Sequence, residues 1–472
     1  MELIHDPAAE TCPNNHQNIR IQLGTKVKLN EGSPKESNDS ALSSPSVESG
    51  QETYPEGGLQ AWLVVFGAFC ALGAVFGIIN TSAVFESYLK KHQLSEYSES
   101  QIGWIFSLYL FLVFFIGIQV GPIFDAYGPR LLVLTGSLLM VASLMFLSIS
   151  TAYILELELT LEQTEYYQII MTYSVMGGLG GAFLYCPAYG AIAHFFNARR
   201  GLATGIATTA GGIGGIVFPL MLQPLLGKDG VGFAWSCRIL GFVILFLCVI
   251  ANLFIRNRLS PERRPKKCSV WPDFSILRHR GFACAAVGVF FTEWGLFVPL
   301  TYIISYAQSH GNGGIESSIL LASLNAGSVL GRFLPGLLAD YVGRFNVIIG
   351  TLLLCVITLL GIWLPAGNSR SMLFAFCTLF GFASGSNLGL IPVCIGQFCD
   401  CSNYGRYITV ANMIASFGTL TSVPIGGAML GLGGSTGWTG LILFSAIAYV
   451  MALSCFVCAR VSSTGWKLWK RF

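Results

Sequence analysis

The sequence predicts an all-α membrane protein with twelve transmembrane helices in two related six-helix bundles. Three observations predict this fold class. Of 472 residues, 53% are hydrophobic and only 11% are charged, whereas about 25% of the residues in a soluble domain are charged. The chain from Leu59 to Ala459 divides into twelve apolar runs, each near the length of about 20 residues that spans a bilayer. A short polar motif follows one such run in each half of the chain.

The motif occurs first as GPIFDAYGPR and returns 215 positions later as GLLADYVGR. Glycine permits a tight turn between antiparallel helices. An aspartate beside an arginine lets each charge offset the other's desolvation and clamp neighbouring helices. The alternative is an ordinary turn with one surface ion pair, but two copies in equivalent places favour related halves. We expect a conformational gate formed by the fixed positions of both copies: Gly121, Asp125, Gly128, Arg130, Gly336, Asp340, Gly343 and Arg344.

The chain between and around these motifs divides into five parts. Residues 1–56 are rich in Ser, Pro, Asn and Glu, so they cannot bury enough apolar area to fold and are predicted to be a disordered tail. The first bundle is expected at 57–256, a connecting loop at 257–280 and the second bundle at 281–459. A basic, aromatic tail at 460–472 is typical of a surface anchor. No secretory signal precedes the first apolar run.

Lysine and arginine are distributed unevenly along this topology. With both termini on one side, 21 of the 27 basic residues fall on that side or in its loops. The positive-inside rule therefore predicts cytoplasmic N- and C-termini. We expect a plasma-membrane protein, with a vacuolar or other internal membrane as the alternative.

Several function classes are disfavoured by the same sequence. The net charge of +3 comes from basic residues at helix ends, which does not indicate nucleic-acid binding. Most of the 14 cysteines lie inside apolar runs, where they act as small packing residues. The glycine clusters at 177–181 and 210–219 lack the strand and lysine of a phosphate loop and instead permit close helix packing. We therefore expect no metal, no cofactor and no enzymatic activity.

Charged residues at membrane depth are the strongest candidates for a functional site. Arg332 precedes Asp340 by eight residues, which places it about 12 Å from the membrane surface. Asn325 and Ser328 lie on the same helix face as Arg332. We expect Arg332 to bind an anionic substrate group and Glu293, at similar depth, to carry a proton. The alternative is a structural ion pair between Glu293 and Arg332.

Further polar residues are weaker candidates. Thr409, Asn412, Ser416 and Thr419 form a helical stripe, which indicates either a cavity wall or hydrogen bonds between helices. Asn412, together with Asn387 and Tyr185, is a candidate substrate contact. Arg238 beside Trp235 is an interfacial or gating charge. His194, Arg199 and Arg200 are assigned to the cytoplasmic junction.

The motifs resemble a known family. The first copy, GxxxDxxGxR, resembles the loop between helices 2 and 3 of major facilitator transporters. The entry to the first helix, YPEGGLQAW at 54–62, looks like the signature of the monocarboxylate porter family, and so do GAF at 67–69 and VFESYL at 84–89. The run from Gly177 to Pro219 is similar to the fungal branch of that family. The resemblance implies a substrate site between two halves that rock in alternating access.

The resemblance also bears on individual site residues. Arg332 matches the family's arginine in helix 8, but the family's aspartate four positions earlier is Ser328 here. The family's lysine in helix 1 falls at Asn80, which we include among the expected substrate contacts. These charges are those of the animal porters, so two of the three charges associated there with lactate and proton movement are absent here.

We expect a secondary active transporter that moves a small organic acid or related metabolite across the lipid bilayer, with H⁺ as a candidate coupling ion. One alternative is an exporter of a fungal secondary metabolite. An alternative from another class is a membrane sensor that keeps the fold without transporting, but no long soluble signalling domain is present in the sequence.

Overall fold

The computed structural model describes residues 54–152, 162–227, 230–258, 270–310, 315–431 and 433–465. Nearly all of the expected N-terminal tail lies outside these residues, as do the segment 259–269 of the connecting loop and the aromatic tail from Trp466 onward.

The first six spans make up the N-terminal half of the molecule. The fourth span contains a π-helical segment, η1, between α4 and α5. The helices of this half are α1 (Leu59–Lys91), α2 (Glu99–Tyr127), α3 (Arg130–Ala152), α4 (Glu162–Ile169), η1 (Ile170–Met176), α5 (Gly177–Phe195), α6 (Arg200–Leu226) and α7 (Gly232–Phe254).

The last six spans make up the C-terminal half, preceded by one short 3₁₀ turn. Its elements are η3 (Phe274–Arg278), α8 (Arg280–Ser309), α9 (Ile315–Val342), α10 (Arg344–Thr358), η4 (Leu359–Trp363), α11 (Arg370–Ile395), η5 (Cys401–Asn403), α12 (Tyr404–Leu430) and α13 (Gly434–Thr464). The last helix continues to Thr464, so the first residues of the expected C-terminal tail are helical.

The predicted fold class is confirmed. Within the described residues, twelve helical segments are long and apolar enough to cross a membrane, and no strand occurs. Helices satisfy the backbone N–H and C=O groups of their interior within one segment, which the hydrocarbon layer requires of any spanning structure. Helix ends carry the expected local signals: Ser98 and Gln101 form a capping box at the start of α2, and Gly128 and Gly343 adopt positive φ angles of 84° and 110° after α2 and before α10.

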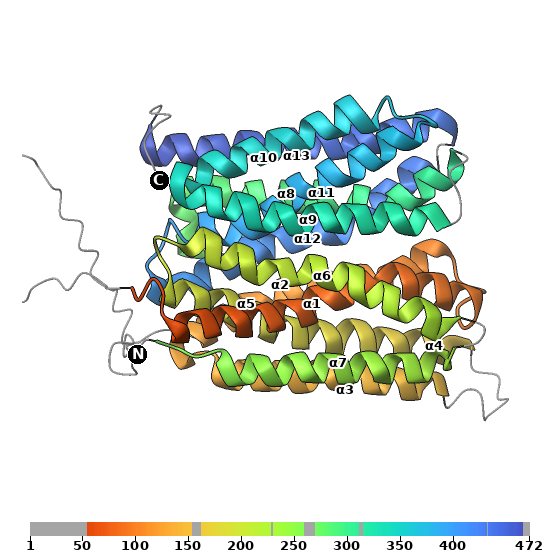
Figure 1. Ribbon diagram of the computed structural model, residues 1–472, viewed down its shortest axis with the longest axis horizontal. Helices are drawn as coiled ribbons and strands as arrows, with labels where there is room; N and C mark the ends of the chain where they lie inside the picture. The colour runs from red at the N-terminus through yellow and green to blue at the C-terminus, as the bar shows by residue number, and fades with distance from the viewer. Residues whose placement is uncertain are drawn as a thin grey trace, which may run out of the picture. The chain divides into compact units, whose positions relative to one another are not determined.

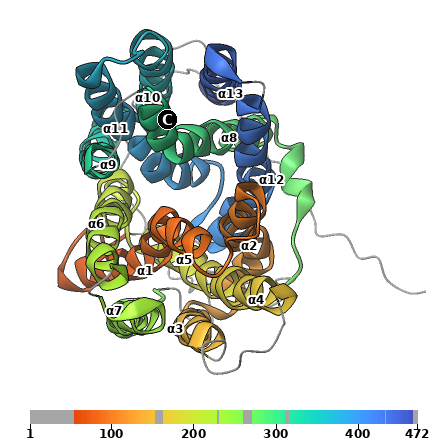
Figure 2. The ribbon, with the colours of Figure 1, turned by 90° about the vertical axis from the view of Figure 1, so that its right-hand side faces the viewer.

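The helices pack as two groups that meet along two seams. Within the N-terminal half α1 packs on α6, α2 on α5, and α3 on α7; within the C-terminal half α9 packs on α11, and α8 packs on α12 and α13. The seams between the halves are α2 with α12 and α6 with α9, and the end-on view in Figure 2 shows both. We call the end of the bundle that carries the start of α1 and the end of α13 the terminal face (Figure 1).

Candidate substrate site

The first copy of the repeated motif holds α2 against α12 at the terminal face. A Cβ on Gly405 would lie 2.6 Å from the carbonyl oxygen of Gly121, so the two backbones touch only because both residues are glycine. One turn further along α2, the Asp125 carboxylate accepts hydrogen bonds from the backbone N–H groups of Gly405 (2.9 Å) and Arg406 (3.0 Å). Asp125 therefore caps the start of a helix from the opposite half.

The second copy makes the same contact at the other seam. A Cβ on Gly336 would lie 2.7 Å from the carbonyl oxygen of Gly201. The Asp340 carboxylate accepts from the N–H groups of Gly201 (2.9 Å) and Leu202 (2.8 Å), at the start of α6. The two motifs thus cap two helices reciprocally across the halves. We call these two glycine-and-aspartate contacts the seam locks.

The arginines of the two motifs differ. Arg344 lies with its Nε 4.0 Å from an oxygen of Asp340 and donates to the carbonyl of Asn197. Arg130 is exposed and forms no ion pair with any described residue. The expected pairing of aspartate with arginine inside one motif therefore occurs in the second copy and not in the first.

Other side chains at the terminal face cross between the halves. Arg200 donates to the carbonyl of Gly396 (3.1 Å), and His194 lies with its Nε2 3.0 Å from the carbonyl of Cys401. Glu56, before α1, accepts from the N–H groups of residues 197, 198 and 199 and so caps the same end of α6 as Asp340. The Arg200 and His194 contacts thus join the two halves at the terminal face.

Arg332 lies at the α6–α9 seam, further from the terminal face. Its Nη1 donates to the carbonyl of Thr208 (2.5 Å), and its guanidinium carbon lies 5.8 Å from the centre of the Phe76 ring. The side chain is 5% exposed, yet its Nε has no hydrogen-bond partner. Glycines of α6 make room for this arrangement: a Cβ on Gly205 would lie 2.5 Å from the Arg332 carbonyl, and one on Gly211 would meet the guanidinium.

Asn325 and Asn80 lie beside Arg332 along α6. Asn325 donates to the carbonyl of Gly215 (3.2 Å), and Asn80 donates to the carbonyl of Gly211 (3.1 Å). A Cβ on Gly215 would lie 2.6 Å from the Asn325 oxygen and 3.0 Å from the Asn80 carboxamide carbon. The structure therefore brings Asn80, Asn325 and Arg332 together on one glycine-lined face of α6.

Ser328 and Asn387 make their contacts inside the C-terminal half. A Cβ on Gly385 of α11 would lie 2.6 Å from the Ser328 hydroxyl. The Asn387 carboxamide accepts from Thr351 of α10 (2.9 Å) and donates to the sulfur of Cys355 (3.5 Å). These two residues are thus turned towards neighbouring helices of their own half rather than grouped with the Arg332 guanidinium.

Glu293 on α8 is a buried acidic residue. It is 4% exposed, and its Oε2 has no hydrogen-bond partner. Its electrostatic neighbours include Tyr185 and Tyr189 of α5 and Tyr449 of α13. Glu293 and Arg332 do not form an ion pair with each other, so the structural alternative for these residues does not occur in this arrangement.

A protein-family model matches most of this sequence. The model of the Major Facilitator Superfamily matches residues 61–414, and again residues 283–467.

The chain belongs to the major facilitator superfamily.

Relatives of this major facilitator protein are fungal transporters. It is 38% identical to the MFS-type transporter opdF of Penicillium oxalicum over 88% of this chain and 94% of the relative. It is 32% identical to the riboflavin transporter MCH5 of Saccharomyces cerevisiae, over 96% and 90% of the two chains. It is 33% identical to the fujikurins efflux protein of Gibberella fujikuroi, over 93% and 91%. The prediction that the chain is a transporter is confirmed.

Solved structures show the same fold. The transporter FucP in its outward conformation superposes with a TM-score of 0.65 at 17% identity, covering 86% of this chain and all of FucP. A bacterial homologue of the iron transporter ferroportin in an outward-facing state gives a TM-score of 0.67 at 12% identity, covering 85% and 99% of the two chains.

Two aromatic residues of the site were not predicted from the sequence of this transporter. Tyr189 is 1% exposed, and its electrostatic neighbours include both Arg332 and Glu293. Phe76 lies against the Arg332 guanidinium and makes an edge contact with Tyr185 at 6.0 Å between ring centres. Spacing offers a signal for both, since Tyr189 follows Tyr185 by four residues and Phe76 precedes Asn80 by four, which places each pair on one helix face.

The polar stripe of α12 has its hydroxyl groups bound within its own helix. Thr409, Ser416 and Thr419 donate to the carbonyls of Gly405, Met413 and Ser416 respectively. Asn412 is buried beside Tyr185. Arg238 bonds to Ser148 of α3 (3.2 Å) and lies over Trp235 at 5.0 Å, so its contacts stay inside the N-terminal half.

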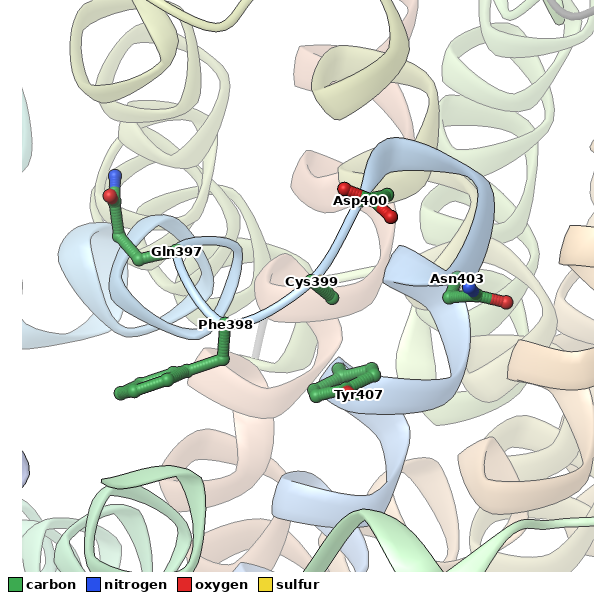
Figure 3. A pocket seen from close by; sticks show the side chains of 6 residues that line it. All are labelled: Gln397, Phe398, Cys399, Asp400, Asn403 and Tyr407. Carbon is green, nitrogen blue, oxygen red and sulfur yellow. The ribbon is translucent and has the colours of Figure 1, made fainter. Parts of the chain in front are cut away.

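A separate shallow pocket of about 260 Å³ opens between the end of α11 and the start of α12 (Figure 3). It is lined by Gln397, Phe398, Cys399, Asp400, Asn403 and Tyr407. These residues lie beside the terminal-face contacts rather than beside Arg332. Among the residues that the structure describes, no group of three His, Cys, Asp or Glu side chains is placed to hold a metal ion.

Proposed function

We propose that this transporter carries an organic anion across its membrane by alternating access of the two halves, with Arg332 binding the anionic group. The observation that carries the proposal is the unpartnered Nε of a guanidinium that is 5% exposed at a seam between the halves. A buried cation with an unsatisfied donor is costly. A carboxylate or other anion would satisfy it through charge-assisted hydrogen bonds.

The seam locks set the direction in which the site opens. Asp125 and Asp340 hold the halves together at the terminal face. The distribution of basic residues supports assigning that face to the cytosol, so this arrangement would correspond to the outward-facing state. The plasma membrane is the proposed location, with an internal membrane such as that of the vacuole as the alternative.

Proton coupling is proposed to involve Glu293. The positions of the family's lysine and aspartate are Asn80 and Ser328 here, and both contact neighbouring helices. Glu293 is the buried acid beside the tyrosines of α5, so it is the candidate that replaces the missing proton carrier. We assign the chain to the monocarboxylate porter branch on its entry motif at 54–62 and the run from Gly177 to Pro219, without assigning lactate as the substrate.

Export of a metabolite made by the cell is the second candidate function. The observation that favours it is the 33% identity, over 93% of this chain, to a relative named as an efflux protein. Uptake and export share the Arg332 site and differ in the gradient that drives transport.

The test compares metabolites inside and outside cells that carry the wild-type chain, no copy of the chain, or the Arg332→Ala variant. We expect the distribution of an acidic metabolite to change with the wild-type chain and not with the variant. A neutral metabolite moved equally by the wild-type chain and by Arg332→Ala would contradict the assignment of Arg332 as the anion site. No change in the distribution of any metabolite would favour the sensor alternative.

A further inference from the structure

Two buried side chains of opposite charge lie in the C-terminal half without meeting. Arg332 on α9 and Glu293 on α8 are 5% and 4% exposed, and each keeps an unpartnered polar atom, Nε and Oε2 respectively. Opposite charges attract strongly where the dielectric constant is low, and each buried charge without a partner costs free energy. Because they do not pair with each other, a ligand that contacts both would satisfy both.

Tyrosines from the N-terminal half lie near these two charges. Tyr189 has both Arg332 and Glu293 among its electrostatic neighbours, and Tyr185 has Glu293. The Tyr185 and Tyr189 rings contact each other edge to face at 4.9 Å. Tyr189 is therefore a neighbour that a ligand in contact with both the guanidinium and the carboxylate would share with them.

The surroundings of these residues are aromatic. The Phe76 ring lies 5.8 Å from the guanidinium carbon of Arg332. Tyr185 makes edge contacts with Phe76 (6.0 Å) and with Phe114 (5.4 Å). Aromatic side chains favour a flat ring through edge-to-face and stacked contacts. Arg332 favours an anionic group on that ring, and Glu293 favours a hydrogen-bond donor.

We propose that the substrate is a ring-containing organic anion that also carries a separate hydrogen-bond donor, a hydroxyl or N–H group. Its anionic group binds Arg332, its donor binds the carboxylate of Glu293, and its ring lies along Tyr189. This inference rests on the proposed function, because it takes Arg332 as the anion-binding residue. It makes Glu293 a specificity-determining residue, since a ring anion without a donor leaves the carboxylate unsatisfied.

The experiment measures competition for binding to the purified full-length chain in detergent. The radiolabelled probe is benzoate, and the competitors are 3- and 4-hydroxybenzoate and their 3- and 4-methoxy counterparts, which keep an oxygen but lack the donor. In the wild type we expect at least one hydroxybenzoate to bind about tenfold or more tightly than its methoxy counterpart, because hydrogen bonds to charged groups are the stronger class.

The variant Glu293→Gln separates a direct contact from a role in folding or in proton movement alone. We expect the advantage of the hydroxyl group to fall to about threefold or less, because a neutral amide accepts a weaker hydrogen bond. The affinity for the methoxy compounds stays unchanged, which shows that the variant is folded. Asn252→Ala serves as the matched control, since Asn252 bonds to Ser137 where α7 packs on α3. This control is expected to bind the hydroxybenzoate more tightly than its methoxy counterpart by the same factor as the wild type.

Equal affinity for each hydroxy and methoxy pair in the wild type would overturn the inference while leaving the anion site in place, provided that benzoate binding still needs Arg332. If Glu293→Gln still binds the hydroxybenzoate more tightly than its methoxy counterpart by the wild-type factor, the inference is also overturned. Glu293 would then be left as a proton carrier without substrate contact. If benzoate does not bind, or if Arg332→Ala binds it as well as the wild type, the proposed anion site and this inference fall together.

Discussion

At the scale of residues, burial without a partner is what marks the site. Arg332 uses one nitrogen to hold the Thr208 carbonyl and leaves its Nε unpartnered. The sequence predicts Arg332 at membrane depth because depth follows from counting residues along one helix. Tyr189 could not be selected in that way, since its relation to Arg332 and Glu293 depends on how α5, α8 and α9 are positioned relative to one another.

The guanidinium itself can be tested by a substitution that keeps the charge. Arg332→Lys is expected to weaken anion binding by about tenfold to a hundredfold, because an ammonium group cannot hold the Thr208 carbonyl and a carboxylate with a planar fork. The measurement is the dissociation constant of an anion that the wild type binds. Arg238→Lys, at a site whose contacts stay within α3 and α7, is the control. Equal binding by Arg332→Lys and the wild type would mean that charge alone suffices.

At the scale of elements, helix pairs approach closely where glycines oppose each other. The sequence identified the repeated motif in α2 and α9 but not its partners at the starts of α12 and α6. Both partner glycines stand next to an arginine in the first turn, as Gly405-Arg406 and Arg200-Gly201. That signal is too short to be specific, because Gly–Arg neighbours are common and the pairing is created only when the halves dock.

The close approach at the α2–α12 seam predicts the effect of one added methyl group. Gly405→Ala places a Cβ 2.6 Å from the Gly121 carbonyl, so α12 must move outward and the seam loses contact. We expect a melting temperature several degrees lower, from a cost of about 1–3 kcal/mol. The matched control is Gly350→Ala on α10, where no heavy atom lies within 4 Å of the added Cβ; a similar loss there would exclude the seam as the cause.

The capping carboxylates predict a second effect at the same scale. Asp125→Asn keeps one acceptor for the amides of Gly405 and Arg406 but removes the charge that complements the start of α12. We expect lower transport with unchanged abundance in the membrane, because the closed terminal face loses about 1–2 kcal/mol. Transport in vesicles checks this, and unchanged turnover would show that the carboxylate is not part of a gate.

At the scale of the whole molecule, the two halves are held together at the terminal face, while Arg332 lies further along the α6–α9 seam. The twelve spans and the two related halves followed from composition, span length and the repeated motif. The conformational state of the transporter does not follow from the sequence. Two packings of the same halves share one sequence and differ only in which contacts between the halves are formed.

Release of both seam locks is expected to open the terminal face. Cys401 is 3% exposed and lies where His194 crosses between the halves. In the double variant Asp125→Asn with Asp340→Asn, its thiol is expected to react with a maleimide several times faster than in the wild type. Mass spectrometry of the labelled peptide measures the rate at this residue. The buried Cys355, which lies inside the C-terminal half against Asn387, is the internal control and stays protected.

The most direct test of the account is flux through the purified chain alone. Proteoliposomes that contain only this protein are loaded with the acidic metabolite that the cell comparison identifies, and exchange of the labelled compound across the membrane is followed. The account predicts rapid exchange by the wild type and none above empty vesicles by Arg332→Ala. Exchange that is equally fast in the Arg332→Ala variant would contradict it, and so would wild-type vesicles that exchange no faster than empty ones.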